Sequence, residues 1–382
     1  MTKERKNMGT TAQIQIRQRL AEFFMGKLYP LVVALIVTVG HIMETEFYFN
    51  VINVALAVVA LCVCDSIRPM FITVTTFIFQ VSKTNAPAWP IFSDYYFTEW
   101  RLPIILCLGA LALFGIVFFV LKNRLLCRIK LFGTRLLLPA LVLSLAFLLN
   151  GVASQSWSVS AFGFGASQII VYLVLFLLFY LGLSERDNAE SLVDYVSYIA
   201  LVISYMIIVQ MIHLFVFGNV ISASGSILKD NINLGWTISN PLASILLSLI
   251  PALFLGAMRK KCGWIYFVTA VLVFISAFMT LSRNSMLFGT ILFVVCVVVL
   301  CVRSPKMRRG ILISSVVSLA ALFVFAVIMR DSIAVVFDQL IKAGFGSTGR
   351  FEIWAEAWEH FLDNMLFGAG FFNLEDSDLD SR

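Results

Sequence analysis

Long apolar runs, separated by short polar connections, occupy most of this chain and constrain its fold more than any other feature. A helix of about 20 apolar residues crosses the roughly 30 Å hydrocarbon core of a bilayer. Hydrophobic residues make up 60% of the 382 residues and charged residues only 13%, a balance that excludes an ordinary soluble domain. The runs lie near residues 28–43, 47–64, 69–82, 102–121, 136–153, 167–183, 195–217, 239–258, 264–281, 285–302 and 310–329. The sequence therefore predicts an all-α polytopic membrane protein with about eleven transmembrane helices.

Cationic residues alternate across these predicted spans. Of the 28 Lys and Arg residues, 20 fall on the side that carries the amino terminus and 8 on the other side. Cytoplasmic loops are the ones that keep an excess of Lys and Arg. Residues 1–27 are too long and too polar for the start of a cleaved signal peptide, so the first span is expected to be retained. We therefore predict a multi-pass protein whose amino terminus is cytoplasmic.

The remaining composition excludes several kinds of partner. The net charge of +6 is explained by the cytoplasmic loops, so no nucleic-acid partner is expected. The seven cysteines and three histidines show no metal-ligand spacing. The chain also has no phosphate-binding loop and no serine-nucleophile motif. We predict membrane lipids as its surroundings, and no metal or cofactor.

Three larger segments fall on the predicted outer side: residues 83–101, residues 218–238, and everything from residue 330 onward. In the last of these, aromatic residues including Trp354 recur at helical spacing up to Asp363, while acidic residues fall mainly elsewhere. This pattern predicts an amphipathic helix, capped by Ser347 or Thr348, within a large extracytoplasmic loop.

Arg283 is the first candidate functional residue, in a very tight predicted turn between two long apolar helices. An arginine at such a place commonly extends its side chain to lipid head groups. Few cations lie on this side, however, and the turn supplies polar neighbours at Ser282, Asn284 and Ser285. A guanidinium held there is able to present a planar fork to a phosphate.

Arg350 is the second candidate, at the start of the predicted outer helix and directly after Gly346-Ser-Thr-Gly349. Arginines at helix ends are commonly solvated. Here, free backbone amides, the positive end of the helix dipole and a guanidinium would together form an anion site. Two arginines converging on one outer cavity would suit a pyrophosphate.

Asn240 and Trp236 lie where the eighth predicted span begins, with Pro241 in its first turn. This placement favours helix capping by Asn240 and anchoring at the membrane interface by Trp236 over sugar binding. His213, inside a predicted span near its outer end, is a weak candidate for an intramembrane base.

Four segments together resemble the O-antigen ligase and O-antigen polymerase family in their order and spacing. They are residues 240–251, the Thr-Leu-Ser-Arg-Asn-Ser turn at 280–285, Gly349-Arg-Phe-Glu-Ile-Trp354, and Leu366-Phe-Gly-Ala-Gly-Phe371. The resemblance covers roughly residues 230–371, and each motif is short and permissive when taken singly.

This resemblance implies a fold like that of the membrane glycosyltransferases, and a metal-independent, inverting enzyme in the bacterial cytoplasmic membrane. Its donor would be a glycan on undecaprenyl pyrophosphate, and its acceptor a glycan or a lipid. Arg283 and Arg350 match the family's two arginines, which are thought to hold the donor pyrophosphate. Ser282, Asn284, Asn240 and Trp354 are the accompanying substrate-binding candidates.

The chain departs from the family pattern at its carboxyl end. Members of the family usually carry a later histidine, proposed as the base that activates the acceptor, and then further spans. This sequence stops at Arg382 before either appears, so it looks truncated, and the base role is not transferred to His360. The expected organisation is a cytoplasmic segment 1–27, a variable transmembrane region 28–217, a family-like transmembrane core 218–329 and a truncated extracytoplasmic loop 330–382.

Two other functions stay open from the sequence. A transporter or flippase of a lipid-linked or anionic solute is disfavoured by the few charged residues within spans and by the lack of paired Gly/Pro-broken helices. An inactive fragment or assembly partner would follow from a shortened carboxyl end.

Overall fold

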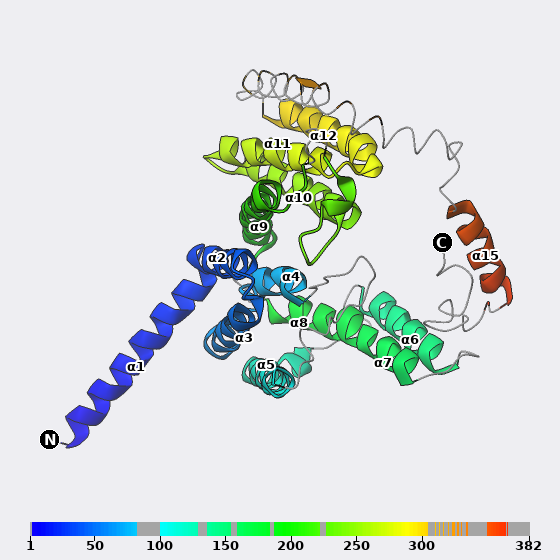
Figure 1. Ribbon diagram of the computed structural model, residues 1–382. Coiled ribbons are helices and arrows are strands. Elements are labelled where there is room, and N and C mark those ends of the chain that lie inside the picture. Colours follow the sequence, from blue (N-terminus) through cyan, green and yellow to red (C-terminus); the bar gives the residue numbers. More distant parts are fainter. Residues whose placement is uncertain are drawn as a thin grey trace. The chain divides into compact units, whose positions relative to one another are not determined.

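The computed structural model describes residues 2–81, 100–128, 136–153, 159–183, 187–221, 227–304, 350–363 and 365, with isolated positions between 310 and 334. Within these residues the chain forms helices and no strand, apart from isolated bridges that pair Ile221 with Ile227 and Asn233 with Ile238. Figure 1 shows the helices. They are α1 (Thr2–Met25), α2 (Leu28–Ile42), α3 (Glu46–Val63), α4 (Met70–Val81), α5 (Leu102–Lys122), α6 (Leu137–Ala153), α7 (Val159–Ile169), α8 (Leu175–Gly182), α9 (Ala189–Phe217), α10 (Ser239–Arg259), α11 (Gly263–Met279), α12 (Arg283–Arg303) and α15 (Arg350–Asp363), with short 3₁₀ turns η1 (Leu125–Arg128) and η3 (Lys229–Asn231) and a π-helical segment η2 (Ile170–Val174).

The helices lie where the apolar runs predict spans. Ten of the eleven ranges contain helix, and the last, 310–329, falls largely outside the described residues. Among the residues that the structure describes, five helices are long and apolar enough to cross a membrane by themselves, namely α3, α5, α9, α10 and residues 285–303 of α12. The chain is therefore a helical membrane protein, and the count of eleven spans stays a prediction.

The amino-terminal segment forms a helix of its own. Helix α1 ends at Met25, and its axis over Ile14–Met25 makes an angle of 66° with the axis of α2. Phe24 and Tyr29 face each other across this bend at 5.0 Å, and both rings are buried. Aromatic packing on the inside of the bend therefore fixes the direction in which the first apolar helix begins.

The chain divides into two compact units. The first comprises residues 1–119 and 184–336, and the second comprises residues 120–183 and 337–382. Helices α9 to α12, all in the first unit, pack side by side (Figure 1). A cluster of buried phenylalanines joins three of them: Phe293 of α12 stacks on Phe274 of α11 at 4.4 Å and meets Phe254 of α10 at 5.6 Å. These rings fill the space between α10, α11 and α12.

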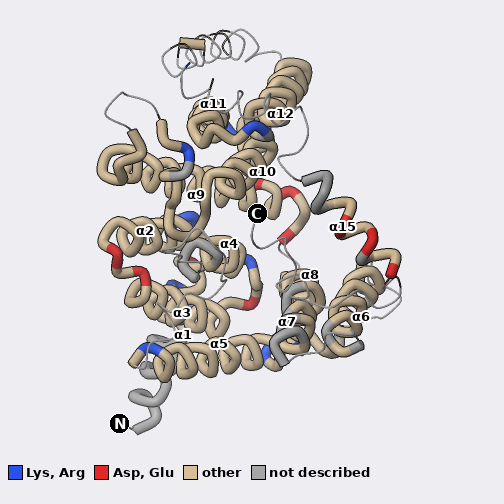
Figure 2. Tube along the Cα trace, turned by 45° about the vertical axis from the view of Figure 1, so that its right-hand side comes forward, with Lys and Arg blue, Asp and Glu red and all other residues tan. Residues whose placement is uncertain are grey.

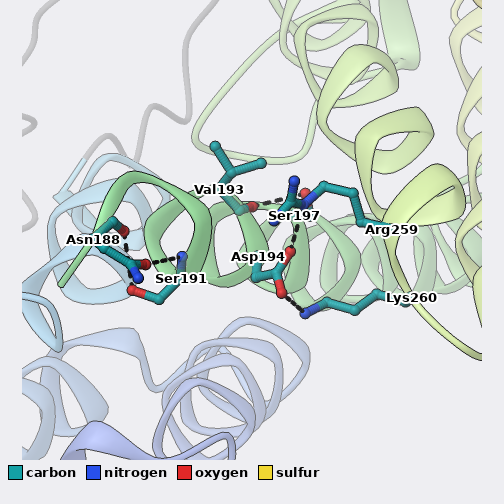
Figure 3. A network of polar contacts seen from close by, with 7 residues as sticks. All are labelled: Asn188, Ser191, Val193, Asp194, Ser197, Arg259 and Lys260. Atoms are coloured by element: carbon teal, nitrogen blue, oxygen red, sulfur yellow. Dashed lines mark hydrogen bonds and ion pairs between the residues drawn. The ribbon is translucent and has the colours of Figure 1, made fainter. Parts of the chain in front are cut away.

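Polar contacts join the start of α9 to the end of α10 (Figure 3). Asn188 caps α9, because its side-chain oxygen accepts a hydrogen bond of 2.8 Å from the Ser191 amide. One turn later, Asp194 accepts a hydrogen bond of 2.9 Å from Arg259 Nε and pairs with Lys260 through its other oxygen. The predicted cytoplasmic cations that follow α10 are thus partly neutralised by a carboxylate on the neighbouring helix.

In the second unit, the range predicted as a single span at 167–183 has different bounds. Helical structure begins at Val159 and continues through α7, η2 and α8 to Gly182. The π-helical segment places Tyr172 against Phe147 of α6, with stacked rings 5.3 Å apart. The predicted start was late because Gly163, Gly165 and Ser167 lower the hydropathy of the first turns without ending the helix.

Candidate functional site

The turn between α11 and α12 is short, buried and closed by its own hydroxyl groups. Thr280 ends α11 and is fully buried, and its side-chain oxygen donates to the Ala277 carbonyl at 2.7 Å and accepts from the Ser282 amide at 3.3 Å. Leu281 adopts a left-handed φ of 54° and is also fully buried. The chain therefore reverses within three residues, as the sequence predicts for this motif.

Ser285 fastens this turn to the preceding helix. Its hydroxyl oxygen lies 2.9 Å from the carbonyl oxygen of Ala277 and 2.8 Å from that of Ser282, and it is fully buried. Ser282 occupies the capping position of α12, but its side chain makes no capping hydrogen bond. The first amides of α12 are thus left without a side-chain partner from Ser282, at the end of the helix where the dipole is positive.

Arg283 is the first residue of α12 and is partly exposed. Among the described residues, no carboxylate pairs with its guanidinium. Three other arginines do have such partners: Arg17 with Asp65, Arg68 with Asp187, and Arg259 with Asp194. Arg283 therefore combines a guanidinium without an acidic partner and a helix amino terminus, two features that favour an anion.

Helices α10 and α12 run in the same direction, which brings Asn240 and Arg283 to one end of the pair. Leu247 faces Gly289 so closely that a Cβ on that glycine would lie 2.8 Å from the leucine side chain, and further along Phe254 meets Phe293. Asn240 is exposed at this end. The capping role expected for it is wrong, because α10 already begins at Ser239 and Ile238 takes the capping position.

Trp236, in the segment that leads into α10, is buried. Only 7% of it is exposed, and its indole Nε1 donates a hydrogen bond of 3.0 Å to Oε1 of the fully buried Gln210 on α9. The interfacial anchoring expected of Trp236 is therefore wrong. Instead, the pair ties residues 227–238 to the end of α9. Gln210 was not singled out from the sequence, although a glutamine inside an apolar span is a visible signal.

Arg350 and Trp354 lie on α15 in the second unit. Arg350 is the first residue of that helix, and its side chain, like that of Asn284, lies outside the described residues. Trp354, Trp358 and Phe361 are exposed, and the last two rings are 5.2 Å apart. The predicted helix is therefore present, whereas Ser347 and Thr348, its expected caps, lie outside the described residues. Whether Arg350 converges with Arg283 stays a prediction.

Charged residues lie mainly near the ends of the apolar helices and along α15, as the tube coloured by charge shows (Figure 2). The part of the chain that the structure describes contains no group of three His, Cys, Asp or Glu side chains able to hold a metal ion. His213 on α9 instead packs its ring 5.0 Å from Phe217.

These features define a helical membrane protein in which Arg283 follows a short, buried turn between two apolar helices. Residues 268–381 match the model of the O-antigen ligase family, a stretch that contains both Arg283 and Arg350. No curated protein and no solved structure matches the chain. The resemblance seen in the sequence is thereby confirmed, and the match supports a membrane glycosyltransferase role of the O-antigen ligase or polymerase type. For such a family, a lipid-linked glycan donor and an acceptor are the general substrates.

Proposed function

We propose that this protein is a membrane glycosyltransferase that polymerises or ligates glycans carried on undecaprenyl pyrophosphate. The reaction would take place at the outer face of the bacterial cytoplasmic membrane, in surface-polysaccharide biosynthesis. The observation that carries the proposal is Arg283: an arginine with no carboxylate partner among the described residues, at the amino terminus of α12, within the stretch that matches the O-antigen ligase family.

The chemistry needs a group that stabilises a departing diphosphate. An acceptor hydroxyl attacks the anomeric carbon of the donor sugar and gives its proton to a base. The bond from that carbon to the pyrophosphate oxygen breaks as the new bond forms, and negative charge grows on the leaving group. A guanidinium and free helix amides that are held in place before the reaction stabilise this negative charge. Because the charge is larger in the transition state than in the bound donor, they lower the barrier to the reaction. An anion site of this kind would need no metal.

The other residues of the proposed site support the same role. Arg350, at the start of α15, would supply a second guanidinium to the diphosphate. Asn240 lies at the end of the α10 and α12 pair that carries Arg283, and its exposed amide would bind sugar hydroxyls. Ser282, Asn284 and Trp354 are the remaining proposed substrate contacts.

Complementation of a deletion strain tests this proposal. We expect loss of surface polysaccharide on deletion, rescue by the wild-type gene, and no rescue by Arg283→Ala or Arg350→Ala. Arg303→Ala is the matched control, because Arg303 is an exposed arginine at the opposite end of α12 and should rescue fully. Membrane levels of each variant are compared by immunoblot. Normal polysaccharide from both Arg283→Ala and Arg350→Ala would refute the site.

A further inference from the structure

The amino-terminal helix α1 meets the first apolar helix, α2, at a sharp bend (Figure 1). The axis of α1 over Ile14–Met25 makes an angle of 66° with the axis of α2. A helix that leaves a span at this angle lies closer to the membrane plane than to its normal, provided that the span runs along the normal. The charge alternation of the sequence predicts this end of α2 in the cytoplasm, so the bend would direct α1 along the inner surface of the membrane.

The length and exposure of α2 place this bend at the lipid boundary. Helix α2 has 15 residues and is therefore about 22 Å long, which is shorter than the roughly 30 Å hydrocarbon core. Its first residue, Leu28, is already 58% exposed, and Leu31 and Leu35 continue the exposed row. Lipid can therefore cover α2 from its first residue, and the chain just before it lies at the membrane interface.

Contacts with two longer helices hold α1 at the same level. The Tyr198 hydroxyl of α9 donates a hydrogen bond of 2.9 Å to the carbonyl oxygen of Lys27, and the Lys27 ammonium lies 5.8 Å from the centre of the Tyr198 ring. Tyr198 lies in the first turn of the span predicted at 195–217. Further back on α1, Arg17 lies 3.8 Å from Asp65, just after the end of α3. Both contacts join α1 to the ends of spans, where Tyr is also common.

One side of α1 over Ile14–Met25 is apolar. Ile16, Leu20 and Phe23 are spaced by four and then three residues, which places them on one side of the helix. Ile16 is 59% exposed and Leu20 is 39% exposed. We call these three residues the apolar face of α1. The remaining circumference carries mainly polar residues, among them Gln15, Gln18 and Glu22.

Cationic residues border the apolar face. By helical spacing, Arg17 falls on one side of this face and Arg19 on the other, and Lys27 adds a third cation at the bend. A helix with an apolar side and flanking cations is suited to lie in the interface plane, where the cations meet anionic lipids. Arg17, Arg19 and Glu22 make it costly for this segment to cross the hydrocarbon core.

We propose that α1 is an interfacial helix that binds the anionic lipid head groups of the cytoplasmic leaflet. The apolar face lies at the boundary between head groups and acyl chains, and Arg17, Arg19 and Lys27 lie at the level of the phosphates. This surface is separate from the α11–α12 turn, and the inference does not depend on glycan transfer.

Spin labels on the full chain test this proposal. In a cysteine-free background, single cysteines are introduced, labelled and reconstituted in nanodiscs of phosphatidylglycerol. Accessibility to oxygen, which dissolves in lipid, is compared with accessibility to a water-soluble nickel chelate. The apolar face is probed by Ile16→Cys and Leu20→Cys, the polar side by Gln15→Cys and Gln18→Cys, and the lipid and water references are Leu35→Cys and Lys261→Cys, both at exposed positions.

We expect the labels at positions 16 and 20 to resemble the lipid reference, and those at positions 15 and 18 to resemble the water reference. Nickel accessibility equal to that of the water reference at all four positions would show that α1 extends into water, and would overturn the proposal. Low accessibility to both agents at positions 16 and 20 would mean that protein covers the apolar face, which would also overturn it.

The role of the anionic head groups is tested with the same labels in nanodiscs of phosphatidylcholine. We expect positions 16 and 20 to shift toward the water reference there, and Arg17→Gln combined with Arg19→Gln to cause the same shift in phosphatidylglycerol. Size-exclusion chromatography verifies that each variant is folded. Equal immersion in both lipids, unaffected by the two arginine substitutions, would contradict recognition of anionic lipid.

Discussion

The position of Arg283 depends on Leu281 and Ser285, two residues that are not proposed to contact substrate. Leu281 holds a left-handed backbone conformation that costs an ordinary side chain about 1 to 3 kcal/mol, and Ser285 ties the turn to α11 through two carbonyl oxygens. The side chain of Leu281 is fully buried. Burial of this side chain is what keeps the turn in its strained form and the guanidinium at the helix start.

Leu281→Gly tests whether backbone strain or burial of the leucine side chain has the larger effect on stability. Glycine would relieve the strained φ, but loss of a buried leucine side chain costs about 2 to 5 kcal/mol. We therefore expect a net destabilisation on the order of 2 kcal/mol, seen as a lower unfolding temperature in detergent. A glycine variant that unfolds at a higher temperature would show that strain, and not packing, dominates this turn.

Individual residues were predictable from the sequence only where their chemistry is local. The tight turn at Thr280 and the first helical position of Arg283 follow from the polar residues between two apolar runs. The burial of Trp236 does not, because it depends on Gln210, a residue of another helix far away in the sequence. The side chains at Arg350 and Asn284 lie outside the described residues, so their roles stay predictions.

Helices in this protein are held together by close approach and aromatic packing more than by charge. A Cβ added to Gly256 of α10 would overlap the ring of Tyr266 on α11, which is only 7% exposed. Asp194, by contrast, is one-third exposed in its contacts with Arg259 and Lys260. Small residues that let helices approach are characteristic of helix–helix interfaces in membranes, so a substitution at Gly256 should cost more stability than one at Asp194.

Gly256→Val should destabilise the protein by about 1 to 3 kcal/mol, the usual cost of overfilling a packed interface. Gly109→Val on α5 is the matched control, since no heavy atom lies within 4 Å of a Cβ built there. Unfolding temperatures of both variants are compared with wild type by size-exclusion chromatography after heating. An equal fall in unfolding temperature in the two variants would contradict close packing between α10 and α11.

Asp194→Asn should change stability by less than about 1 kcal/mol, because ion pairs that are partly exposed contribute little. The same thermal assay, repeated at low and high salt, measures it. If the unfolding temperature fell by several degrees at both low and high salt, Asp194 would have a larger structural role than its contacts with Arg259 and Lys260 indicate.

At the scale of the whole molecule, the sequence predicted best the positions of the apolar helices, which follow from the need to match a lipid environment. Ten of the eleven apolar runs contain helix, and the match over residues 268–381 confirmed the family resemblance. Helix bounds were less predictable where Gly and Ser interrupt a run, as at Val159, and where a charged segment forms helix on its own, as in α1. The buried polar residues of α3, Glu46, Asn50 and Asn53, were not singled out from the sequence, because helical spacing separates them within an apolar run.

Orientation of the molecule is tested with a single reactive cysteine in intact cells. In a cysteine-free background, a restored Cys262 lies in the exposed connection between α10 and α11, and Thr237→Cys lies just before α10. The charge alternation predicts that a membrane-impermeant maleimide labels the cysteine at position 237 and leaves Cys262 unlabelled until the cells are opened. The reverse labelling would invert the topology.

Binding of undecaprenyl pyrophosphate to the purified protein tests the role of Arg283 most directly. Charge-assisted hydrogen bonds of this kind contribute about 1.5 to 3 kcal/mol, so Arg283→Gln should weaken binding by about 10- to 100-fold. Arg303→Gln, at the far end of the same helix, should bind like wild type. Equal affinity in wild type and Arg283→Gln would contradict a diphosphate site at the start of α12.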